Sequence, residues 1–220
     1  MAKKLILAAT INATKCSMVS LKDEQERRRQ YIEVLGKYLK NTNLDLIFIE
    51  NSGSDISFLK KIYKDFEHRI EYISFNGNQG VEINGKGHGE RNSLRYALQN
   101  SELLKNEKFF FKVSGRYFSK EIEPIINKVN TEEFLCISGQ PNQNRHIGTV
   151  FIGSNIELFL SIFKEDAVIN DHSSNIFEAH YYKLVSSVWS NEQTKNKIFW
   201  MKPIFYENAV SSTGERVTYV

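Results

Sequence analysis

Short apolar segments alternate with longer charged segments along the first 130 residues of the chain, and no other sequence feature limits the fold as much. Residues 44–50 (LDLIFIE) and 108–113 (KFFFKV) suit strands in the middle of a sheet. Residues 21–41 are rich in Glu, Arg and Lys and place apolar side chains at helical spacing. Strands that alternate with helices form right-handed βαβ units, so we predict an α/β fold with a mostly parallel sheet.

The same pattern assigns the remaining elements. We expect strands at residues 4–11, 44–50, 69–75, 108–113, 134–138, 149–152 and 198–205. We expect helices at residues 21–41, 56–66, 90–104, 120–129, 155–163 and 174–189. Ser20 is the expected cap of the first helix. A chain of 220 residues that is 41% hydrophobic suits one domain with a sizeable core. Its cysteines, Cys16 and Cys136, are expected to be reduced core thiols.

The overall charge and the lack of long apolar segments limit the class of partner. The formal net charge is +3, which suits anionic small molecules or an anionic membrane surface and is too small to indicate nucleic acid. Residues 5–11 form an apolar run that is short for a signal peptide, and no small-x-small cleavage pattern follows it. No segment reaches the ~18 apolar residues that span a bilayer. We therefore expect a cytoplasmic protein and leave contact with the inner face of the plasma membrane open.

Polar residues follow the first four predicted strands, where each strand ends. In parallel sheets, ligands sit beyond the carboxyl ends of the strands. The segments in question are residues 10–12, 50–55, 76–89 and 114–117. All four are polar and three contain glycine, so we predict that they form one rim that binds a small, polar, anionic ligand.

Two of these segments have a specific chemistry. Residues 84–92 (NGKGHGERN) combine three glycines with Lys86 and His88 before a helix that we expect to begin at Glu90. Free backbone N–H groups and cations near a helix N-terminus bind anions, although a flexible surface loop is the alternative. Residues 50–55 (ENSGSD) could accept hydrogen bonds from a nucleobase N–H or a ribose hydroxyl, or could simply be a turn capped by Asp55.

The order of these motifs resembles the nucleotide-sugar half of GT-A glycosyltransferases. The resemblance covers about residues 4–120 and rests on ENSGSD after the second strand and on GERN at residues 89–92. More narrowly, GKGHGE and FFFKVSGRYF, with the tail at residues 211–215, are similar to small bacterial glycosyltransferases of capsule or lipopolysaccharide assembly. The resemblance implies a single GT-A-like domain, with a nucleotide-sugar half at residues 1–120 and an acceptor half at residues 121–220.

The resemblance also implies a reaction and its partners. A glycosyltransferase of hexosyl or related groups would take a nucleotide-sugar donor and a saccharide or lipid-linked saccharide acceptor. Such enzymes usually carry Asp-x-Asp at the end of the fourth strand, where it holds a divalent metal on the diphosphate. Here that position reads KVSGR, so we assign no metal ligand and leave a requirement for Mn²⁺ or Mg²⁺ open.

Arg116, helped by Lys112, is the expected substitute for that metal. A guanidinium presents a planar fork that matches a phosphate, and Gly115 allows close approach of the backbone. The alternative is that Lys112 reaches the surface and Arg116 pairs with a carboxylate. The complete set of expected donor-binding residues is Thr10, Asn12, Glu50, Asn51, Ser52, Lys86, His88, Glu90, Asn92, Lys112, Ser114, Gly115 and Arg116.

The second half of the chain is expected to supply the general base and to bind the acceptor. Asp171, in a turn before the helix at residues 174–189, is the first candidate for the base, and simple helix capping is its alternative role. The other catalytic candidates are Glu178, His172 and His180. Arg145 and His146 are expected to contact the acceptor or a phosphate, and the tail at residues 211–216, with Arg216, to close over the donor.

Two other functions remain possible on the sequence alone. A non-catalytic GT-A-like binding module would explain the missing Asp-x-Asp. A sugar nucleotidyltransferase would share the sheet, but it normally has a glycine-rich basic loop after the first strand. Residues 12–16 (NATKC) contain no glycine.

Overall fold

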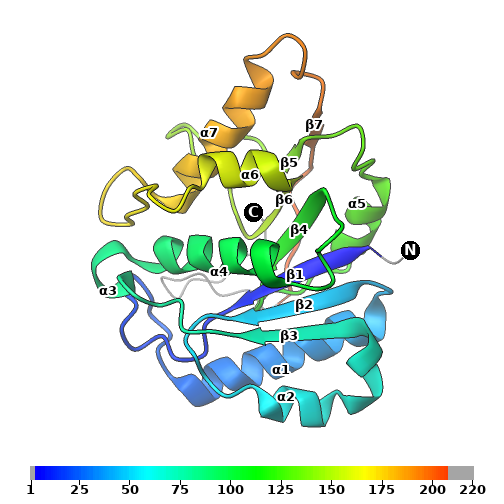
Figure 1. The fold of residues 1–220 in the computed structure, drawn as a ribbon, viewed down its shortest axis with the longest axis vertical. Helices are drawn as coiled ribbons and strands as arrows, with labels where there is room; N and C mark the ends of the chain where they lie inside the picture. The colour runs from blue at the N-terminus through cyan, green and yellow to red at the C-terminus, as the bar shows by residue number, and fades with distance from the viewer. Residues whose placement is uncertain (1–2, 208–220) are drawn as a thin grey trace.

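A single twisted sheet runs through the molecule. The computed structural model describes residues 3–207, and in this part of the chain the strand order is β3-β2-β1-β4-β6-β5-β7 (Figure 1). The strands are β1 (Lys4–Ala9), β2 (Asp45–Glu50), β3 (Ile70–Ser74), β4 (Phe109–Ser114), β5 (Cys136–Ser138), β6 (Phe151–Asn155) and β7 (Ile198–Trp200). β1 to β4 are parallel, β6 runs antiparallel to β4 and β5, and β7 is parallel to β5. The predicted mostly parallel α/β fold is confirmed.

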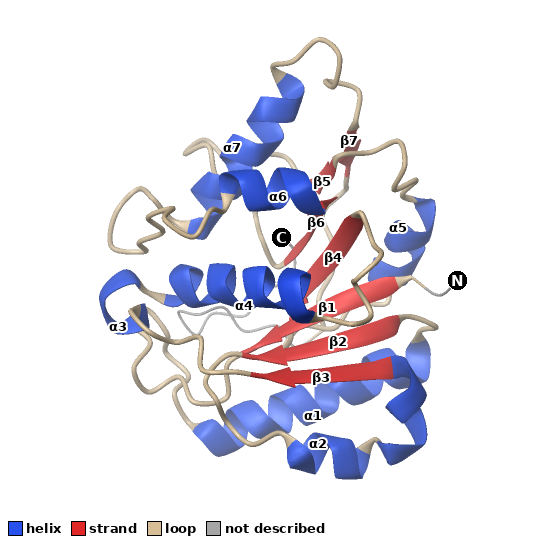
Figure 2. Ribbon diagram, in the orientation of Figure 1, coloured by secondary structure: helices blue, strands red, loops and turns tan. Residues whose placement is uncertain are grey.

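Helices cover both faces of the sheet (Figure 2). They are α1 (Glu24–Asn41), α2 (Ser57–Ile62), the 3-10 helix η1 (Lys64–Arg69), α3 (Val81–Asn84), α4 (Lys86–Asn100), α5 (Ile122–Lys128), α6 (Ile156–Ile162) and α7 (Phe177–Trp189). α1, α2 and α5 pack on one face, and α4, α6 and α7 pack on the other. We call these the α1 face and the α4 face.

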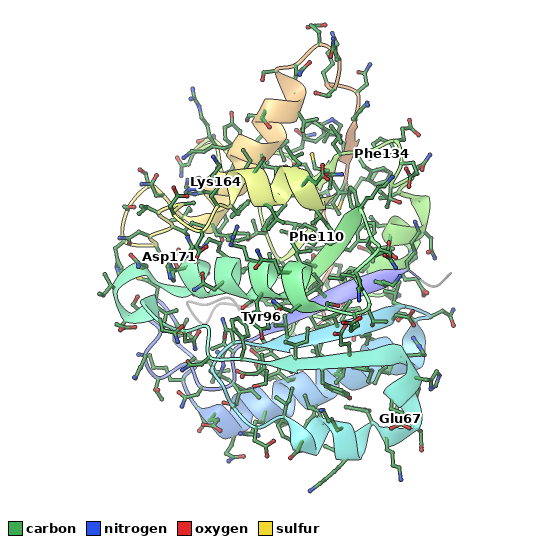
Figure 3. The ribbon with its side chains drawn as sticks, in the orientation of Figure 1. Glu67, Tyr96, Phe110, Phe134, Lys164 and Asp171 are labelled. Atoms are coloured by element: carbon green, nitrogen blue, oxygen red, sulfur yellow. The ribbon has the colours of Figure 1, made fainter. Side chains whose placement is uncertain are left out.

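Alternation along the strands explains why both faces are apolar. Successive side chains of a strand point to opposite faces, so Leu5 and Leu7 of β1 enter the core of the α1 face and Ile6 enters that of the α4 face. On β4, Phe109 and Phe111 face α1. Phe110, labelled in Figure 3, faces α4 and packs edge-on against Phe159 of α6, with ring centroids 5.0 Å apart. Lys112 therefore also points to the α4 face, two residues beyond Phe110.

Several predicted helix ends were wrong. α1 begins at Glu24 because the Asp23 carboxylate, not Ser20, caps it, accepting a hydrogen bond of 2.8 Å from Glu26 N. The helix expected at residues 56–66 is divided into α2 and η1. The predicted glycine-rich loop is wrong as well, because α4 begins at Lys86 and includes two of the three glycines.

None of the helices within residues 3–207 is both long and apolar enough to cross a lipid bilayer.

Candidate active site

A cavity of about 240 Å³ opens where β1 and β4 end, and we call it the central cavity. Residues at the ends of β1, β2 and β4 form its floor: Thr10, Asn51, Ser114, Gly115 and Arg116. Arg27 and Tyr31 of α1 line it on the α1 face, and Lys86 and Glu90 of α4, Thr149 and Glu178 of α7 line it on the α4 face. The cavity thus lies at the predicted rim, beyond the carboxyl ends of parallel strands.

A second cavity, of about 360 Å³, lies beside the first, and we call it the amide cavity. Its walls include the amide side chains of Asn12, Asn76, Asn78 and Gln79, together with Ser52. Asn78 lines both cavities. The side-chain oxygen Asn78 Oδ1 is buried and has no hydrogen-bond partner among the described residues. The two cavities therefore share Asn78 as a common wall residue.

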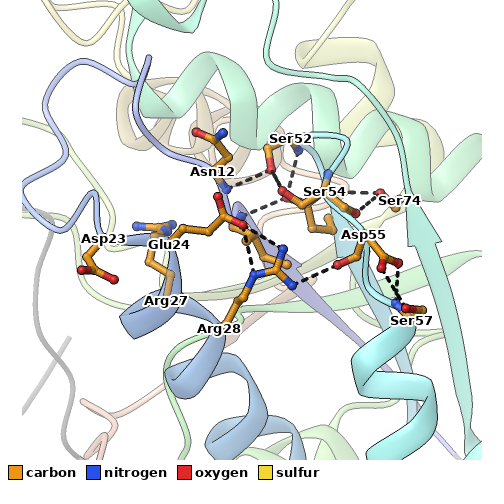
Figure 4. A network of polar contacts seen from close by, with 12 residues as sticks. Asn12, Asp23, Glu24, Arg27, Arg28, Ser52, Ser54, Asp55, Ser57 and Ser74 are labelled. Atoms are coloured by element: carbon orange, nitrogen blue, oxygen red, sulfur yellow. Dashed lines mark hydrogen bonds and ion pairs between the residues drawn. The ribbon is translucent and has the colours of Figure 1, made fainter.

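Glu50 is buried beneath this rim and shapes it. Its carboxylate accepts hydrogen bonds from the backbone N–H groups of Ile11, Ser52 and Ser54, each at 2.9 Å, and from the Ser52 hydroxyl. Figure 4 shows the network around Ser52, Ser54 and Asn12, in which Asn12 N donates to Ser52 Oγ at 3.0 Å. Glu50 has no exposed surface, so its oxygens fix the two loops to each other. A ligand contact remains a prediction for Asn12 and Ser52, which line the amide cavity.

Asn51 and Thr10 connect the strand ends to α4. The Thr10 hydroxyl donates to Asn51 Oδ1 at 2.7 Å, and Asn51 Nδ2 donates to the Gly89 carbonyl at 3.0 Å. Both residues line the central cavity, as their place after β1 and β2 predicted. Because the polar side-chain atoms of Thr10 and Asn51 form hydrogen bonds within the protein, these two residues hold the cavity floor in place.

Arg116 lines the central cavity on the side of α1. Its Nη1 atom donates to Gln30 Oε1 at 3.0 Å, and no carboxylate of residues 3–207 forms an ion pair with it. The alternative that Arg116 pairs with a carboxylate is therefore not seen in the described part of the chain. Gly115 precedes it, and its N–H donates to the Ala8 carbonyl at 2.8 Å. A side chain there would place its Cβ 2.9 Å from that oxygen, so β4 can approach β1 this closely only with glycine.

Lys112 was expected either to bind the donor phosphate or to reach the surface, and it does neither. Its ammonium is completely buried on the α4 face, so it neither reaches the surface nor lines the central cavity. It forms an ion pair with Glu90 and donates to the Thr149 carbonyl at 2.7 Å and to Ser114 Oγ at 3.2 Å. A buried ammonium needs such partners, because desolvation of an unpaired charge is costly. Lys112 thus positions Glu90 from behind and does not contact a ligand in the cavity.

The first turn of α4 brings only part of the predicted set to the cavity. Lys86 and Glu90 line it, whereas His88 and Asn92 do not. Asn92 donates to the Gly77 carbonyl at 3.1 Å and so ties the preceding loop to the helix. Burial lowers the pKa of His88, and the nearby Arg91 acts in the same direction.

Asp171 lies at the N-terminus of α4, outside the residues that line the central cavity. Its Oδ2 atom accepts a hydrogen bond of 3.0 Å from Gly87 N, and its backbone N–H donates to the Asn84 carbonyl at 2.8 Å. A Cβ on Gly85 or on Gly87 would come within 2.6 Å of the Asp171 side chain. The geometry is that of a carboxylate stabilising a helix N-terminus, and a role as general base stays a prediction.

Glu178 is the catalytic candidate that the structure brings to the central cavity. Thr149 Oγ1 donates to its Oε1 atom at 3.4 Å. Burial raises the pKa of the Glu178 carboxyl, Glu90 and Asp171 add to this, and Lys86 acts against it. A half-buried carboxyl with a raised pKa at a cavity wall is a candidate for proton transfer.

The remaining candidates lie away from the central cavity. The exposed His172 ring contacts Ser17 Oγ at 2.9 Å, and His180 is buried in the core against Phe163, where burial lowers its pKa. Arg145 and His146 lie in a turn whose residues line neither cavity. The tail at residues 211–216, with Arg216, lies outside the described residues.

Sequence reasoning missed Arg27. It belongs to a charged run, EQERRRQ, that is typical of a solvated helix face, and yet only 5% of it is exposed. The available signal was its spacing, since Arg27 lies four residues before Tyr31 on the apolar stripe of α1.

The end of β4 does not offer a set of metal ligands. It carries Ser114, Gly115 and Arg116, and the nearest acidic residue on α4, Glu90, is already paired with Lys112. Within residues 3–207, no three His, Cys, Asp or Glu side chains come together to hold a metal ion by protein ligands alone. The end of β4 therefore lacks the acidic pair that, by the resemblance, would hold a divalent ion there.

No known family model matches the chain, and no curated protein matches it by sequence. Solved structures do match its fold. One is the glycosyltransferase GlyE of Streptococcus pneumoniae TIGR4, with a TM-score of 0.52 and 12% identity over 92% of this chain and 45% of that one. Another is the galactosyltransferase LgtC, solved with donor and acceptor sugar analogs. It matches with a TM-score of 0.50 and 8% identity, over 90% of this chain and 73% of that one.

A third match belongs to another class of enzyme. It is a protein from Bacillus anthracis that is assigned as a glucose-1-phosphate thymidylyltransferase without a demonstrated activity. It matches with a TM-score of 0.51 and 8% identity, over 94% of this chain and 89% of that one. At such identities the likeness shows the fold alone. The chain is thus a single α/β domain with the GT-A-like fold that these sugar-nucleotide enzymes share.

Proposed function

We propose that the chain is a glycosyltransferase that binds a nucleotide-sugar donor in the central cavity and transfers the sugar to a hydroxyl of a saccharide acceptor. The observation that carries this proposal is the chemistry of the cavity walls. Arg116 and Arg27 lie on the α1 face without a carboxylate partner among residues 3–207, and Glu178 with its raised pKa lies on the opposite side. Guanidinium groups suit phosphates, and a carboxylate of raised pKa suits proton transfer.

The two cavities suit the two ends of such a donor. Amide side chains both donate and accept hydrogen bonds, as the edge of a nucleobase does, so the amide cavity is the proposed nucleoside site. The phosphates would then lie at Arg116, where Gly115 permits close approach of the backbone. The sugar would lie towards Glu90 and Glu178 on the α4 face.

Glu178 is the proposed general base of an inverting transfer. The acceptor hydroxyl oxygen forms a bond to the anomeric carbon while the bond from that carbon to the phosphate oxygen breaks. The electron pair of the broken bond leaves with the nucleotide, and the hydroxyl proton passes to the Glu178 carboxylate. Asp171 is less well placed because it binds the N-terminus of α4.

Finer points of the function rest on the sequence resemblance. We propose a hexosyl or related donor, a saccharide or lipid-linked saccharide acceptor and a role in bacterial surface-polysaccharide assembly, in the cytoplasm at the inner face of the plasma membrane. Labelled sugar that enters a lipid extract of the reaction supports the lipid-linked acceptor. Label that appears only in water-soluble saccharides contradicts it.

The direct experiment measures nucleotide release. Purified protein is incubated with UDP-, GDP-, CMP- and dTDP-sugars, with and without oligosaccharide acceptors. Free nucleotide that appears faster with an acceptor supports the proposal. Tight binding without any turnover indicates instead a non-catalytic binding module.

A sugar nucleotidyltransferase is the second candidate, because the thymidylyltransferase match covers 89% of that chain. Incubation with a sugar 1-phosphate and a nucleoside triphosphate separates the two activities. Only a nucleotidyltransferase releases pyrophosphate, and we expect none.

A further inference from the structure

Both tryptophans of the chain, Trp189 and Trp200, line a third cavity, of about 320 Å³, which we call the tryptophan cavity. Their ring centroids lie 5.2 Å apart with an angle of 73° between the ring planes, which is an edge-to-face arrangement. Trp189 is 55% exposed and Trp200 is 37% exposed. Single exposed apolar side chains are ordinary at a protein surface, whereas two adjoining indole rings at a hollow are typical of a binding site.

The sequences of α7 and β7 bring these rings together. Figure 1 shows α7 beside β7 at one end of the sheet. Tyr182, Ser186 and Trp189 recur at helical spacing and so lie on one side of α7. On β7, Ile198 packs in the core of the α4 face, so Trp200, two residues further along, points to the same face and meets α7. Because β7 is the last strand in the order of the described sheet, part of Trp200 stays exposed.

The walls of the tryptophan cavity combine aromatic rings with hydroxyl groups. Besides the two tryptophans, Tyr182 and Ser186, they include Pro141, Ile147, Val185 and Ser190, so no described residue that lines this cavity is charged. The side-chain hydroxyls of Tyr182, Ser186 and Ser190 form no hydrogen bond with another residue of 3–207. Each hydroxyl can donate one hydrogen bond and accept others. These walls therefore suit a neutral ligand that has an apolar face and hydroxyl groups at its edge.

A neutral saccharide has this combination of surfaces. One face of a pyranose ring presents C–H groups, which carry a partial positive charge and pack on the negative face of an indole ring. The sugar hydroxyls lie around the edge of the ring, where serine and tyrosine hydroxyls can exchange hydrogen bonds with them. An anionic ligand would gain no opposite charge from these walls, and a hydrocarbon ligand would bury the protein hydroxyls without partners. The volume falls within the range of small-molecule sites, roughly 300–1,000 Å³.

We propose that the tryptophan cavity is a saccharide-binding site, separate from the central cavity, that takes a neutral sugar unit. No described residue lines both cavities. The sugar packs against the indole rings of Trp189 and Trp200 and exchanges hydrogen bonds with the hydroxyls of α7. The site binds the sugar without reacting with it, so this proposal stands apart from the proposed function and assigns no step of the transfer to these residues.

Tryptophan fluorescence tests the proposal directly, because both tryptophans of the chain lie at this cavity and the sugars do not fluoresce. The protein is titrated with neutral di- and trisaccharides of glucose, galactose, mannose and N-acetylglucosamine. At least one of them should shift the emission to shorter wavelength and reduce quenching by acrylamide. Trp189→Ala, followed through Trp200, should weaken that affinity at least about tenfold, and Trp189→Phe should keep part of it. Phe205→Ala, which removes an exposed aromatic ring outside the cavity, is the control.

The outcomes separate this site from its alternatives. No change in emission or quenching with any of these sugars overturns the proposal, and so does equal affinity in Trp189→Ala and the wild type. A shift caused by anionic phospholipid vesicles or by decaproline, and by no sugar, contradicts it in favour of a membrane surface or a proline-rich peptide. If Trp189→Ala does not fold, acrylamide quenching of the wild type decides, because a sugar packed on the indole rings must protect them. The titration contains no nucleotide sugar, so its failure leaves the proposed function intact.

Discussion

At the scale of single residues, Glu178 carries the proposed proton transfer. Glu178→Gln keeps the size of the side chain and removes its basicity, so turnover should fall by ~10²–10⁴. Affinity for the donor should change little, because the proposed phosphate contacts lie on the opposite face. Single-turnover kinetics and nucleotide binding measure the two effects. Unchanged turnover would exclude Glu178 and return Asp171 as the candidate.

The pKa of Glu178 also sets the pH dependence of the reaction. A general base works only when deprotonated, so turnover falls as the pH drops through its pKa. Burial raises this pKa, which moves the acid limb of the profile above the range of an ordinary glutamate. Lys86 acts against the rise, so Lys86→Gln should move the acid limb to still higher pH. A limb that stays in place in this variant would show that another group titrates.

Gly115 sets the close approach of β4 to β1. In Gly115→Ala, the new Cβ would lie 2.9 Å from the Ala8 carbonyl and 3.3 Å from the Tyr31 ring. Because neither backbone can easily move, we expect a loss of about 1–3 kcal/mol in the free energy of unfolding. Gly139→Ala is the control, since nothing lies within 4 Å of the new Cβ there. Denaturant unfolding measures both variants, and equal stability would contradict the close contact.

The sequence revealed some of these residues and concealed others, for physical reasons. Ser114 and Arg116 could be predicted because they follow an apolar strand, and strand ends in parallel sheets meet at one rim. The buried ion pair of Lys112 could not be predicted, since its partner Glu90 lies 22 residues away on α4. Arg27 looks like its exposed neighbours until the packing of α1 on the sheet is known.

At the scale of elements, the start of α4 depends on Asp171. Asp171→Ala removes the acceptor of Gly87 N and a negative charge at a helix N-terminus. We expect a loss of about 1 kcal/mol in stability and faster amide exchange at residues 85–90. Glu132→Gln, which changes an exposed acid outside α4 and its contacts, should change neither. Exchange that is equally slow in both variants would mean that Asp171 does not hold this helix end.

The elements show where sequence patterns suffice. The expected strands overlap all seven strands of the described sheet, because short runs rich in apolar residues favour buried strands. The glycine-rich stretch was predicted as a loop because each glycine disfavours a helix by about 1 kcal/mol. Tertiary packing offsets this preference in the first turn of α4. A Cβ on Gly87 would lie 2.6 Å from Asp171 Oδ1, and a Cβ on Gly89 would be in tight contact with Val81 at 3.1 Å and Asn51 at 3.2 Å.

At the scale of the whole molecule, the fold leaves the reaction open. Glycosyltransferases and a nucleotidyltransferase share it at 8–12% identity, so only the chemistry of the cavity separates these functions. The sequence resemblance implies carboxylates and a metal at the end of β4, where this chain instead carries Arg116.

Because Arg116 is proposed to take the place of a metal, we expect the transfer activity to resist removal of metal ions by a chelator. If guanidinium groups neutralise the donor phosphates, transfer should continue in excess EDTA at close to its original rate. Addition of Mn²⁺ or Mg²⁺ should raise the rate only slightly. Loss of activity in EDTA that either ion restores would mean that a metal acts at the site, with Glu50, Asp55 and Asp171 as the first residues to examine.

Donor binding through Arg116 is the central claim, and a thermal-shift titration tests it most directly. The wild-type protein and Arg116→Ala are each melted with increasing UDP-, GDP-, CMP- and dTDP-sugars. Ligand at a hundredfold excess over its dissociation constant stabilises the native state by about 2.7 kcal/mol, so the wild type should melt several degrees higher with its donor. Arg116→Ala should melt near the wild-type temperature without ligand and lose most of the rise. A rise of equal size in the variant, or none in the wild type with any nucleotide sugar, would contradict the account.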